Sequence, residues 1–322
     1  MTPARTTHRP AARRVKACSA LLAAALLALT GCGGGEIPEE RRARDYGAQD
    51  VVSATAEVPA IAAHVPAQTR ASGTLRIGSG IGVPPIAFSP EGGGEPRGVD
   101  IDVSEAVARV LGLTVDRQHV SGASLITGLN AGRYELGTAN LAVTQERTQV
   151  LDFVLYLTDG AGFAVREDSA LKQVTGLGEL CGLHVGTGIG TTFESDLRAA
   201  AEKCATEGKK PLQISTYPDA ATHFLALRQG HVDILMTTSS VLRYAAAQQP
   251  GLRYLNELDR KNVGLAMKKD SPLAQPVKEA VDHLIQDGTY ARILKKWNLE
   301  PAAVPASAVN PPPTPAPAPA VP

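Results

Sequence analysis

The sequence predicts an α/β fold made of two lobes of similar plan. Between residues 74 and 304, short apolar segments typical of strands alternate with amphipathic segments typical of helices, which favours largely parallel sheets. Two segments also share one arrangement, in which a helix ends, Gly132 or Gly230 caps it, and a strand follows through an acidic residue. Because the same arrangement occurs twice, we expect two lobes.

The expected elements follow one another in chain order. In the segment 99–111, Val99, Val103 and Val107 fall on one helical face and Gly112 stops the run, which predicts a helix. Before and after it we expect strands at 74–78 and 113–119 and a helix at 125–130. The rest of the body is expected to contain strands at 183–186 and 232–236, and helices at 192–202, 220–228, 277–285 and 290–297.

Composition and charge exclude some classes of protein. The chain has 322 residues, with 32 basic and 32 acidic side chains and a formal net charge of zero. A nucleic-acid binder would show a basic patch and a high pI, so we expect no nucleic-acid partner. Aromatic residues make up only 4% of the chain, which leaves few rings to stack on a ligand.

The N-terminal 31 residues predict a signal peptide. Basic residues between Arg5 and Lys16 precede an apolar run at 20–29, which is too short to span a membrane as a stable helix. The run ends in Leu29-Thr30-Gly31-Cys32, which resembles a bacterial lipobox. We expect Cys32 to carry a lipid that anchors the protein at the outer face of the cytoplasmic membrane. The alternative is an ordinary signal peptide with a chance cysteine.

The remaining cysteines predict a disulfide. Cleavage before Cys32 leaves Cys181 and Cys204 free to pair in an oxidising compartment. Zinc is the competing use, but no histidine lies at ligand spacing around either cysteine, so we expect no metal site.

The two ends of the mature chain predict no fold of their own. Residues 32–73 are rich in Gly, Ala, Glu and Pro without a sustained period, which predicts a flexible tether. Residues 305–322 form a Pro/Ala segment, for which we expect extended disorder.

The body resembles the bacterial extracellular solute-binding proteins of family 3, of the polar amino-acid type. The resemblance rests on several short segments in the family's order, and the composition and cysteine spacing look like actinobacterial members. The segments are Gly73–Gly78, Pro84–Phe88, Gly98–Asp102, Val143–Arg147, Val150–Phe153, Gly190–Thr192 and Gly288–Trp297.

This resemblance implies the type II periplasmic-binding fold with two hinge crossovers. The first lobe would comprise residues 74–164 and 266–304, and the second lobe residues 165–265. The crossovers would lie near Gly162–Val165 and Gly264–Met267. A ligand in the cleft would favour closure by binding the closed form better than the open one.

The resemblance also implies how an anion is held. Arg147 of the Thr-x-x-Arg motif would grip a ligand carboxylate, because a guanidinium donates two parallel hydrogen bonds to one. The alternative is an ion pair with a neighbour such as Asp152. The backbone N–H groups and hydroxyls of Gly190, Thr191 and Thr192 precede a helix and would bind the same anion.

The departures from the family concern the ligand's ammonium group. Thr238 stands where members usually have an acid, Ala142 where they have a Ser or Thr, and Val83 where they have an aromatic residue. The expected ligand is therefore a small carboxylate-bearing molecule, and an α-amino acid needs a neighbouring acid or carbonyl to replace the lost one. Asn140 is expected to contribute a side-chain amide or a carbonyl.

These features predict a solute-binding lipoprotein of an ABC importer. Its expected partners are a small anionic ligand, a permease with its ATPase, and the membrane through the lipid; we expect a monomer without a cofactor. A ligand-sensing module that signals to a membrane partner is one alternative. An enzyme on the same scaffold is the other, but no nucleophile–base pair is apparent, so we expect no catalysis. Asp100 and Asp102 are expected to cap the helix that they start and to interact with its dipole.

Overall fold

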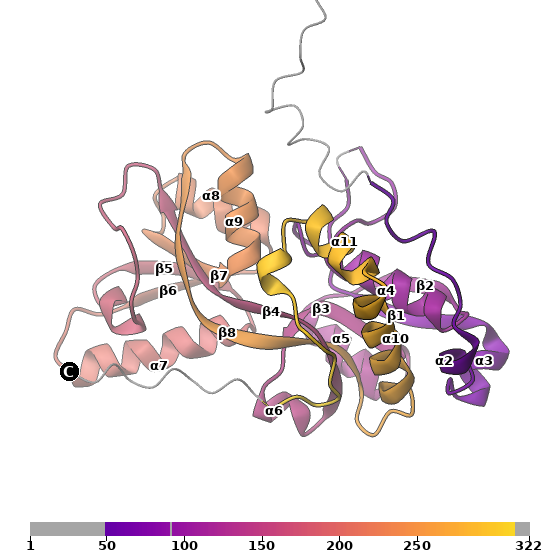
Figure 1. The fold of residues 1–322 in the computed structure, drawn as a ribbon. Coiled ribbons are helices and arrows are strands. Elements are labelled where there is room, and N and C mark those ends of the chain that lie inside the picture. The colour runs from indigo at the N-terminus through magenta and orange to yellow at the C-terminus, as the bar shows by residue number, and fades with distance from the viewer. Residues whose placement is uncertain (1–48, 91, 313–322) are drawn as a thin grey trace, which may run out of the picture. The chain divides into compact units, whose positions relative to one another are not determined.

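Two long strands run antiparallel through the middle of a mixed sheet. They are β4 (Leu151–Arg166) and β8 (Leu252–Lys268), and the strand order is β2-β1-β3-β8-β4-β7-β5-β6 (Figure 1). The computed structural model describes residues 49–90 and 92–312. On one side of the long strands lie β1 (Thr74–Ser79), β2 (Thr114–His119) and β3 (Leu136–Ala142), and on the other β5 (His184–Gly188), β6 (Gln213–Tyr217) and β7 (Ile234–Thr238).

The predicted α/β fold is confirmed, with a more mixed sheet than expected. Within each side the strands are parallel: β1 pairs with β2 and β3, and β5 pairs with β6 and β7. The antiparallel pairs all involve β4 or β8, because these strands join the two sides.

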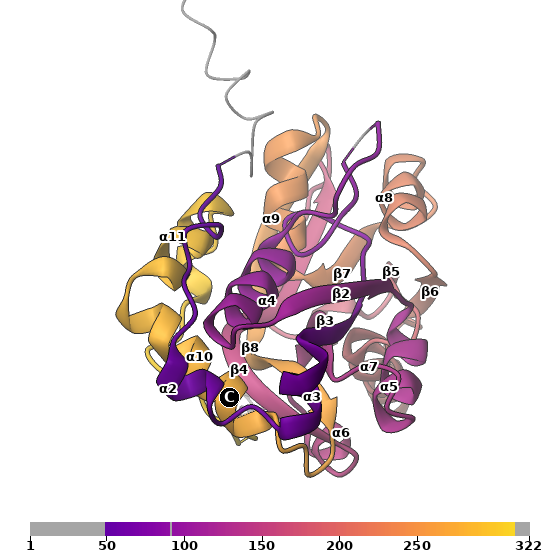
Figure 2. The same ribbon diagram turned by 90° about the vertical axis from the view of Figure 1, so that its right-hand side faces the viewer.

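Helices pack on both halves of the sheet, the first side with β1, β2 and β3 and the second side with β5, β6 and β7 (Figures 1 and 2). Every predicted helix is found within a few residues of its expected bounds. The first side carries α4 (Val99–Val110), α5 (Gly122–Asn130), α6 (Gln145–Thr148), α10 (Ala274–Gln286), α11 (Thr289–Lys296) and the turn η3 (Glu300–Ala302). The second side carries η2 (Leu177–Leu180), α7 (Thr192–Thr206), α8 (Ala220–Arg228) and α9 (Ser239–Gln248).

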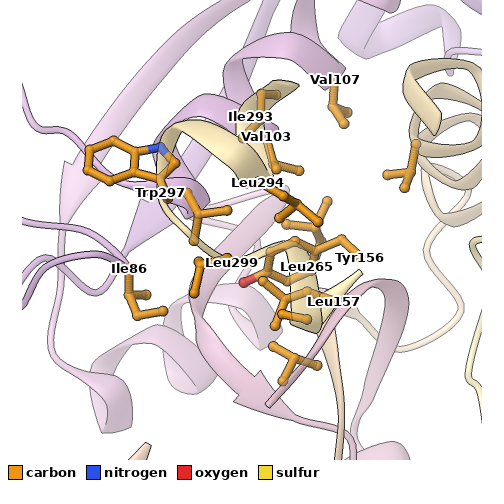
Figure 3. Packing of buried hydrophobic residues seen from close by; sticks show 14 of the residues in the cluster. Ile86, Val103, Val107, Tyr156, Leu157, Leu265, Ile293, Leu294, Trp297 and Leu299 are labelled. Atoms are coloured by element: carbon orange, nitrogen blue, oxygen red, sulfur yellow. The ribbon is translucent and has the colours of Figure 1, made fainter. Parts of the chain in front are cut away.

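The largest core forms where α4 and α11 pack on the long strands. Val103 and Val107 of α4 meet Ile293 and Leu294 of α11 in one apolar cluster (Figure 3). Trp297 is almost fully buried beside them. Each apolar side chain of this size stabilises the fold by roughly 1.5–3 kcal/mol when it leaves water.

The acids at the start of α4 do not cap it with their side chains. Trp297 Nε1 donates a hydrogen bond of 2.7 Å to Asp102, and Lys296 Nζ lies 2.8 Å from the same oxygen. Asp100 instead accepts from Tyr156 and Asn140. No side chain caps this helix, so the expected capping role is wrong, although both carboxyl groups lie in its first turn.

The predicted crossovers lie inside the two sides. Gly162–Val165 pairs with β7, and Gly264 and Ala266 pair with β3. Between them, the stretch 158–160 of β4 pairs with β8 alone. In each long strand the residues that cross between the two sides therefore precede the expected ones by about four positions. The lobe ranges remain a prediction.

The expected tether is wrong for residues 49–73. Val52, Ala62 and Val65 are buried, and the segment forms α2 (Pro59–Ala62) and α3 (Ala67–Ser72). It runs past α4 and α10 (Figure 2), where Val58 N–H donates to the carbonyl of Val110 at 3.0 Å. Its apolar residues pack as an irregular strap, so they show no period in the sequence. Residues 32–48 lie outside the described part of the chain.

The expected disorder is wrong for residues 305–312. Ser307 is buried, its Oγ donates to the carbonyl of Leu155 at 2.7 Å, and Asn310 N–H donates to the carbonyl of Phe153 at 2.8 Å. Here β4 does not pair with β7, so its edge needs other backbone partners. Residues 313–322 lie outside the described part.

A disulfide joins Cys181, just after η2, to Cys204 of α7, with 5.7 Å between the Cα atoms. This is the pairing that the cysteine count predicts. Within residues 49–90 and 92–312, no helix is both long enough and apolar enough to cross a membrane. The signal peptide, 1–31, and Cys32 lie outside these residues.

Candidate functional site

A cavity of about 790 Å³ lies where the two sides of the sheet meet. Its wall is formed by the end of β3 and by α6, by the crossover stretches of β4 and β8, and by the starts of α7 and α9. Seven of the eight predicted ligand-binding residues line it: Asn140, Ala142, Arg147, Gly190, Thr191, Thr192 and Thr238. Such a concave site between two halves of a sheet is where a small ligand is expected.

The eighth predicted residue does not line this cavity. Val83 forms an isolated bridge with Ala87 and packs against the main apolar core. The placement of Val83 at the ligand is therefore wrong, because the short loop that contains it packs on the core.

Arg147 offers a cation that pairs with no acid among the described residues. Thr144 caps α6 by accepting from the N–H of Arg147 at 3.2 Å, and one guanidinium nitrogen donates to the carbonyl of Ala142 at 3.0 Å. In the described part of the chain Arg147 makes no ion pair, while Asp152 pairs with Lys269 at 3.2 Å. Burial lowers the pKa of Arg147, but a guanidinium stays charged in proteins. Most of its N–H donors remain available to a ligand.

The start of α7 is only partly free to bind an anion. The N–H of Gly190 donates to Glu194 at 2.8 Å, and Thr191 Oγ accepts from the N–H of Glu194 while donating to the carbonyl of Gly188. The Gly190 N–H and the Thr191 hydroxyl are therefore used inside the protein. The N–H groups of Thr192 and Phe193 belong to the first helical turn, where no intrahelical partner exists, and they are the donors left for a ligand.

A buried acid that the sequence argument missed lines the same cavity. Asp159 of β4 is 8% exposed and accepts from the N–H of Gly160 at 2.9 Å and from the N–H and hydroxyl of Ser240. Burial is the strongest influence on this carboxyl and raises its pKa despite those hydrogen bonds. The available signal was a single acid inside the otherwise largely apolar run 153–165.

A second acid, Asp259, lines the cavity from the crossover stretch of β8. Its backbone is left-handed, with a φ of +51°. Burial raises its pKa, against the opposing charge of Lys261. Lys261 itself pairs with Asp196 at 3.3 Å. Asp259 has no ion pair of its own in the described residues.

Asn140 and Thr238 present polar groups beside these acids. Asn140 Nδ2 lies 3.4 Å from Asp159 Oδ2, and its Oδ1 is buried without a hydrogen-bond partner among the described residues. Thr238 precedes α9, and its hydroxyl does not cap that helix. The cavity thus combines an unpaired cation, free helix N–H groups and buried acceptors.

The chain matches the family model described as bacterial extracellular solute-binding proteins, family 3, over residues 75–300. It is similar to the arginine-binding protein ArgT of Corynebacterium glutamicum, with 29% identity over 256 residues that cover 79% of this chain and 83% of that protein. It is also similar to the ABC transporter glutamine-binding protein GlnH of Bacillus subtilis, with 29% identity over 216 residues that cover 65% and 76%.

Solved structures share the fold. An ancestral arginine-binding protein bound to arginine has a TM-score of 0.63 and 28% identity, and the match covers 70% of this chain and 98% of that chain. An ancestral amino acid-binding protein, AncCDT-1, described as a precursor of cyclohexadienyl dehydratase, has a TM-score of 0.64 and 26% identity, covering 71% and 97%. The predicted two-lobed binding-protein fold is the fold of both.

Proposed function

Because this chain belongs to the bacterial extracellular solute-binding proteins of family 3, we propose that its cavity captures an α-amino acid for an ABC permease and its ATPase. The observation that carries the proposal is one cavity lined by both the unpaired guanidinium of Arg147 and the buried carboxyl of Asp159. An α-amino acid carries the two opposite charges that these groups complement.

The carboxylate end uses Arg147 and the start of α7. A guanidinium with free N–H groups binds a carboxylate through two parallel, charge-assisted hydrogen bonds. The N–H groups of Thr192 and Phe193 add donors at the positive end of the helix macrodipole. Arg147 and the start of α7 line the cavity from the two different halves of the sheet. A carboxylate bound between them therefore favours closure of the two halves.

The ammonium end uses Asp159 in place of the acid that is missing at Thr238. A cation beside a carboxyl group favours its ionised form, which opposes the effect of burial on the pKa of Asp159. Asn140 Oδ1 supplies a second acceptor at the same place. With these two acceptors, a buried ammonium group has hydrogen-bond partners and its cost of leaving water is offset.

The charges around the cavity favour a ligand with a positive side chain. Arg147 and Lys261 line the cavity as cations, and Asp159 and Asp259 line it as anions when ionised. Asp196 is not part of the wall but pairs with Lys261 and neutralises it. Two positive and three negative groups leave one negative charge, which a cationic amino acid neutralises and a neutral one does not. The arginine-binding relatives agree with this choice, and the glutamine-binding one provides the contrasting ligand.

The location, the lipid anchor, the monomeric state and the absence of catalysis belong to the same proposal. We place the protein outside the cytoplasmic membrane, anchored through a lipid on Cys32 and acting as a monomer without catalysis. The family and its binding-protein relatives support this assignment. The short apolar run at 20–29 and the sequence Leu29-Thr30-Gly31-Cys32 support the anchor.

A thermal-shift panel tests the ligand. The panel contains the twenty L-amino acids and a set of organic acids without an ammonium group. A hundredfold excess of ligand over its Kd stabilises the folded state by about 2.7 kcal/mol, and we expect the largest shift from arginine or lysine. Larger shifts from the organic acids than from every amino acid would overturn the proposal. Conversion of the bound amino acid, followed by mass spectrometry, would instead reveal an enzyme.

A further inference from the structure

Asn140 lies where β3 departs from regular pairing. The register between β3 and β8 shifts between Gly137 and Leu141, and the backbone of Asn140 is left-handed, with a φ of +47°. A bulge of this kind turns a side chain to a new direction, and here Asn140 lines the cavity. Left-handed backbone is uncommon for residues other than glycine; asparagine adopts it more readily than most, and a hydrogen bond from a neighbouring group helps to hold it.

Asp100 is the side chain that holds this backbone. It is fully buried in the first turn of α4, where one carboxyl oxygen accepts from the N–H of Asn140 at 3.1 Å and the other accepts from the hydroxyl of Tyr156. It makes no ion pair in the described part of the chain. A buried carboxyl is costly unless hydrogen-bonded, and burial raises its pKa to about 6. One of the two groups that donate to the Asp100 carboxyl is thus the backbone N–H of Asn140, a residue that lines the cavity.

Among the described residues, the side-chain amide of Asn140 contacts a protein partner through only one of its two polar atoms. Nδ2 lies 3.4 Å from Asp159 Oδ2, while Oδ1 is buried and has no partner among the described residues. Turning the amide over would place Oδ1 against the carboxylate, acceptor against acceptor, so the observed orientation is the favourable one when Asp159 is ionised. The Oδ1 atom and Asp159 then present two neighbouring acceptors, which suits the several N–H donors of an ammonium.

We propose that Asp100 is a positioning residue that fixes the left-handed backbone of Asn140, so that Oδ1 of Asn140 accepts a hydrogen bond from the ligand's ammonium. The proposal rests on the proposed function, because it assumes an amino-acid ligand. Asp100 acts through Asn140, since α4 is not part of the cavity wall. Its effect is therefore confined to ligands that carry the ammonium group.

Because only ligands with an ammonium group should be affected, a positioning role of Asp100 can be distinguished from a general structural role. A merely destabilised protein binds an amino acid and its deaminated analogue more weakly by the same factor. Loss of positioning weakens the amino acid alone. The informative quantity is the selectivity ratio, defined as the Kd of desamino-arginine divided by the Kd of L-arginine.

A double-mutant cycle measures this ratio in the full chain by calorimetry. Asn140→Gly keeps a left-handed backbone without strain and removes the amide, while Asp100→Ala removes the acceptor that holds the backbone. Each change should lower the selectivity ratio about tenfold, the value of one hydrogen bond to a charged group. In the Asn140→Gly protein, adding Asp100→Ala should leave the ratio unchanged within about twofold, because the group that Asp100 positions is gone. Independent, additive losses would overturn the proposal.

Two control variants guard against a folding artefact. Asp100→Asn should restore the ratio, because its Oδ1 still accepts from Asn140 and its amide donates to the Tyr156 hydroxyl. Asp102→Ala removes a carboxyl from the same helical turn whose partners are Trp297 and Lys296, and it should leave the ratio unchanged. A ratio lowered equally by Asp102→Ala would overturn the proposal.

A ligand-free crystal structure separates this inference from the proposed function. If neither probe binds the wild-type protein, the proposed cationic amino acid is wrong. The Asp100→Ala structure then decides the positioning role on its own, because Asn140 should leave the left-handed region when its acceptor is removed. Asn140 remaining near its φ of +47° would overturn the proposal whatever the ligand is.

Discussion

The two ends of the cavity are built differently, one from helix starts and one from crossover strands. The carboxylate end consists of Arg147 in α6 and the first turn of α7, each in a short contiguous segment. The acid end consists of Asp159 and Asp259 on the two long strands, together with Asn140. The first end can be assembled from local motifs, while the second exists only once distant strands pair.

This difference also concerns motion. The acid end lies on the crossover stretches, where β4 pairs with β8 alone and where closure of the two sides would concentrate backbone change. The carboxylate end lies on segments fixed to each side. We therefore expect the carboxylate end to supply most of the affinity and the acid end to supply selectivity.

The largest expected effect is at the carboxylate end. Arg147→Ala removes a bidentate, charge-assisted interaction worth roughly 3 kcal/mol, so the Kd for L-arginine should rise about a hundredfold. Arg147→Lys keeps the charge but lacks the planar guanidinium, so its Kd for L-arginine should lie between those of the wild-type protein and Arg147→Ala. Calorimetry on Arg228→Ala, an exposed arginine at the end of α8, is the matched control. A Kd within threefold of wild type would show that another group holds the carboxylate.

A smaller effect is expected at the acid end. Asp159→Asn keeps the shape of the side chain but removes the charge that faces the ammonium, so the Kd for L-arginine should rise about tenfold or more. The Kd for desamino-arginine should stay near the wild-type value. Asp287→Asn is the control, because its carboxyl accepts from the N–H of Thr289 at 2.7 Å, lies 3.7 Å from His283 and does not line the cavity. Equal weakening of both ligands would remove Asp159 from the ammonium end.

The smallest expected effect is a dependence on pH that only one end shows. Burial holds the pKa of Asp159 above its ordinary value of 3.8, so this carboxyl takes up a proton at a higher pH than an ordinary aspartate does. A bound ammonium favours the ionised form, and acidification toward that raised pKa should weaken L-arginine binding. Arg147 stays charged throughout, so desamino-arginine should not follow the same profile. Calorimetry of both ligands from pH 7 downward checks this, and parallel profiles would contradict it.

Most of the fold and the carboxylate end were predictable from sequence because their signals are local. The helix at 99–111 and the Thr-x-x-Arg motif ending at Arg147 depend on residues within a few turns of one another. The donors of Gly190 and Thr191 were overestimated for the same reason. The carboxylate of Glu194 takes the Gly190 N–H and the carbonyl of Gly188 takes the Thr191 hydroxyl, and a motif read on its own does not include these competing acceptors.

The acid end and the packed ends of the chain depend on long-range pairing. Asp159 meets Ser240 only because β4 pairs with β7, and neither segment signals the other. Residues 49–73 and 305–312 resemble linkers in composition, yet they fill an apolar surface beside α10 and an unpaired edge of β4. In each case the missing information was which surface of the folded body remained uncovered.

The measurement that tests the central claim most directly compares three ligands on the wild-type protein. L-arginine carries both charged head groups, desamino-arginine lacks the ammonium, and agmatine lacks the carboxylate. A cavity with an anion-binding end and an acid end should bind L-arginine at least tenfold more tightly than either analogue, with agmatine the weakest. Binding of desamino-arginine as tight as that of L-arginine would contradict an ammonium end at Asp159, and equally tight agmatine would contradict the role of Arg147.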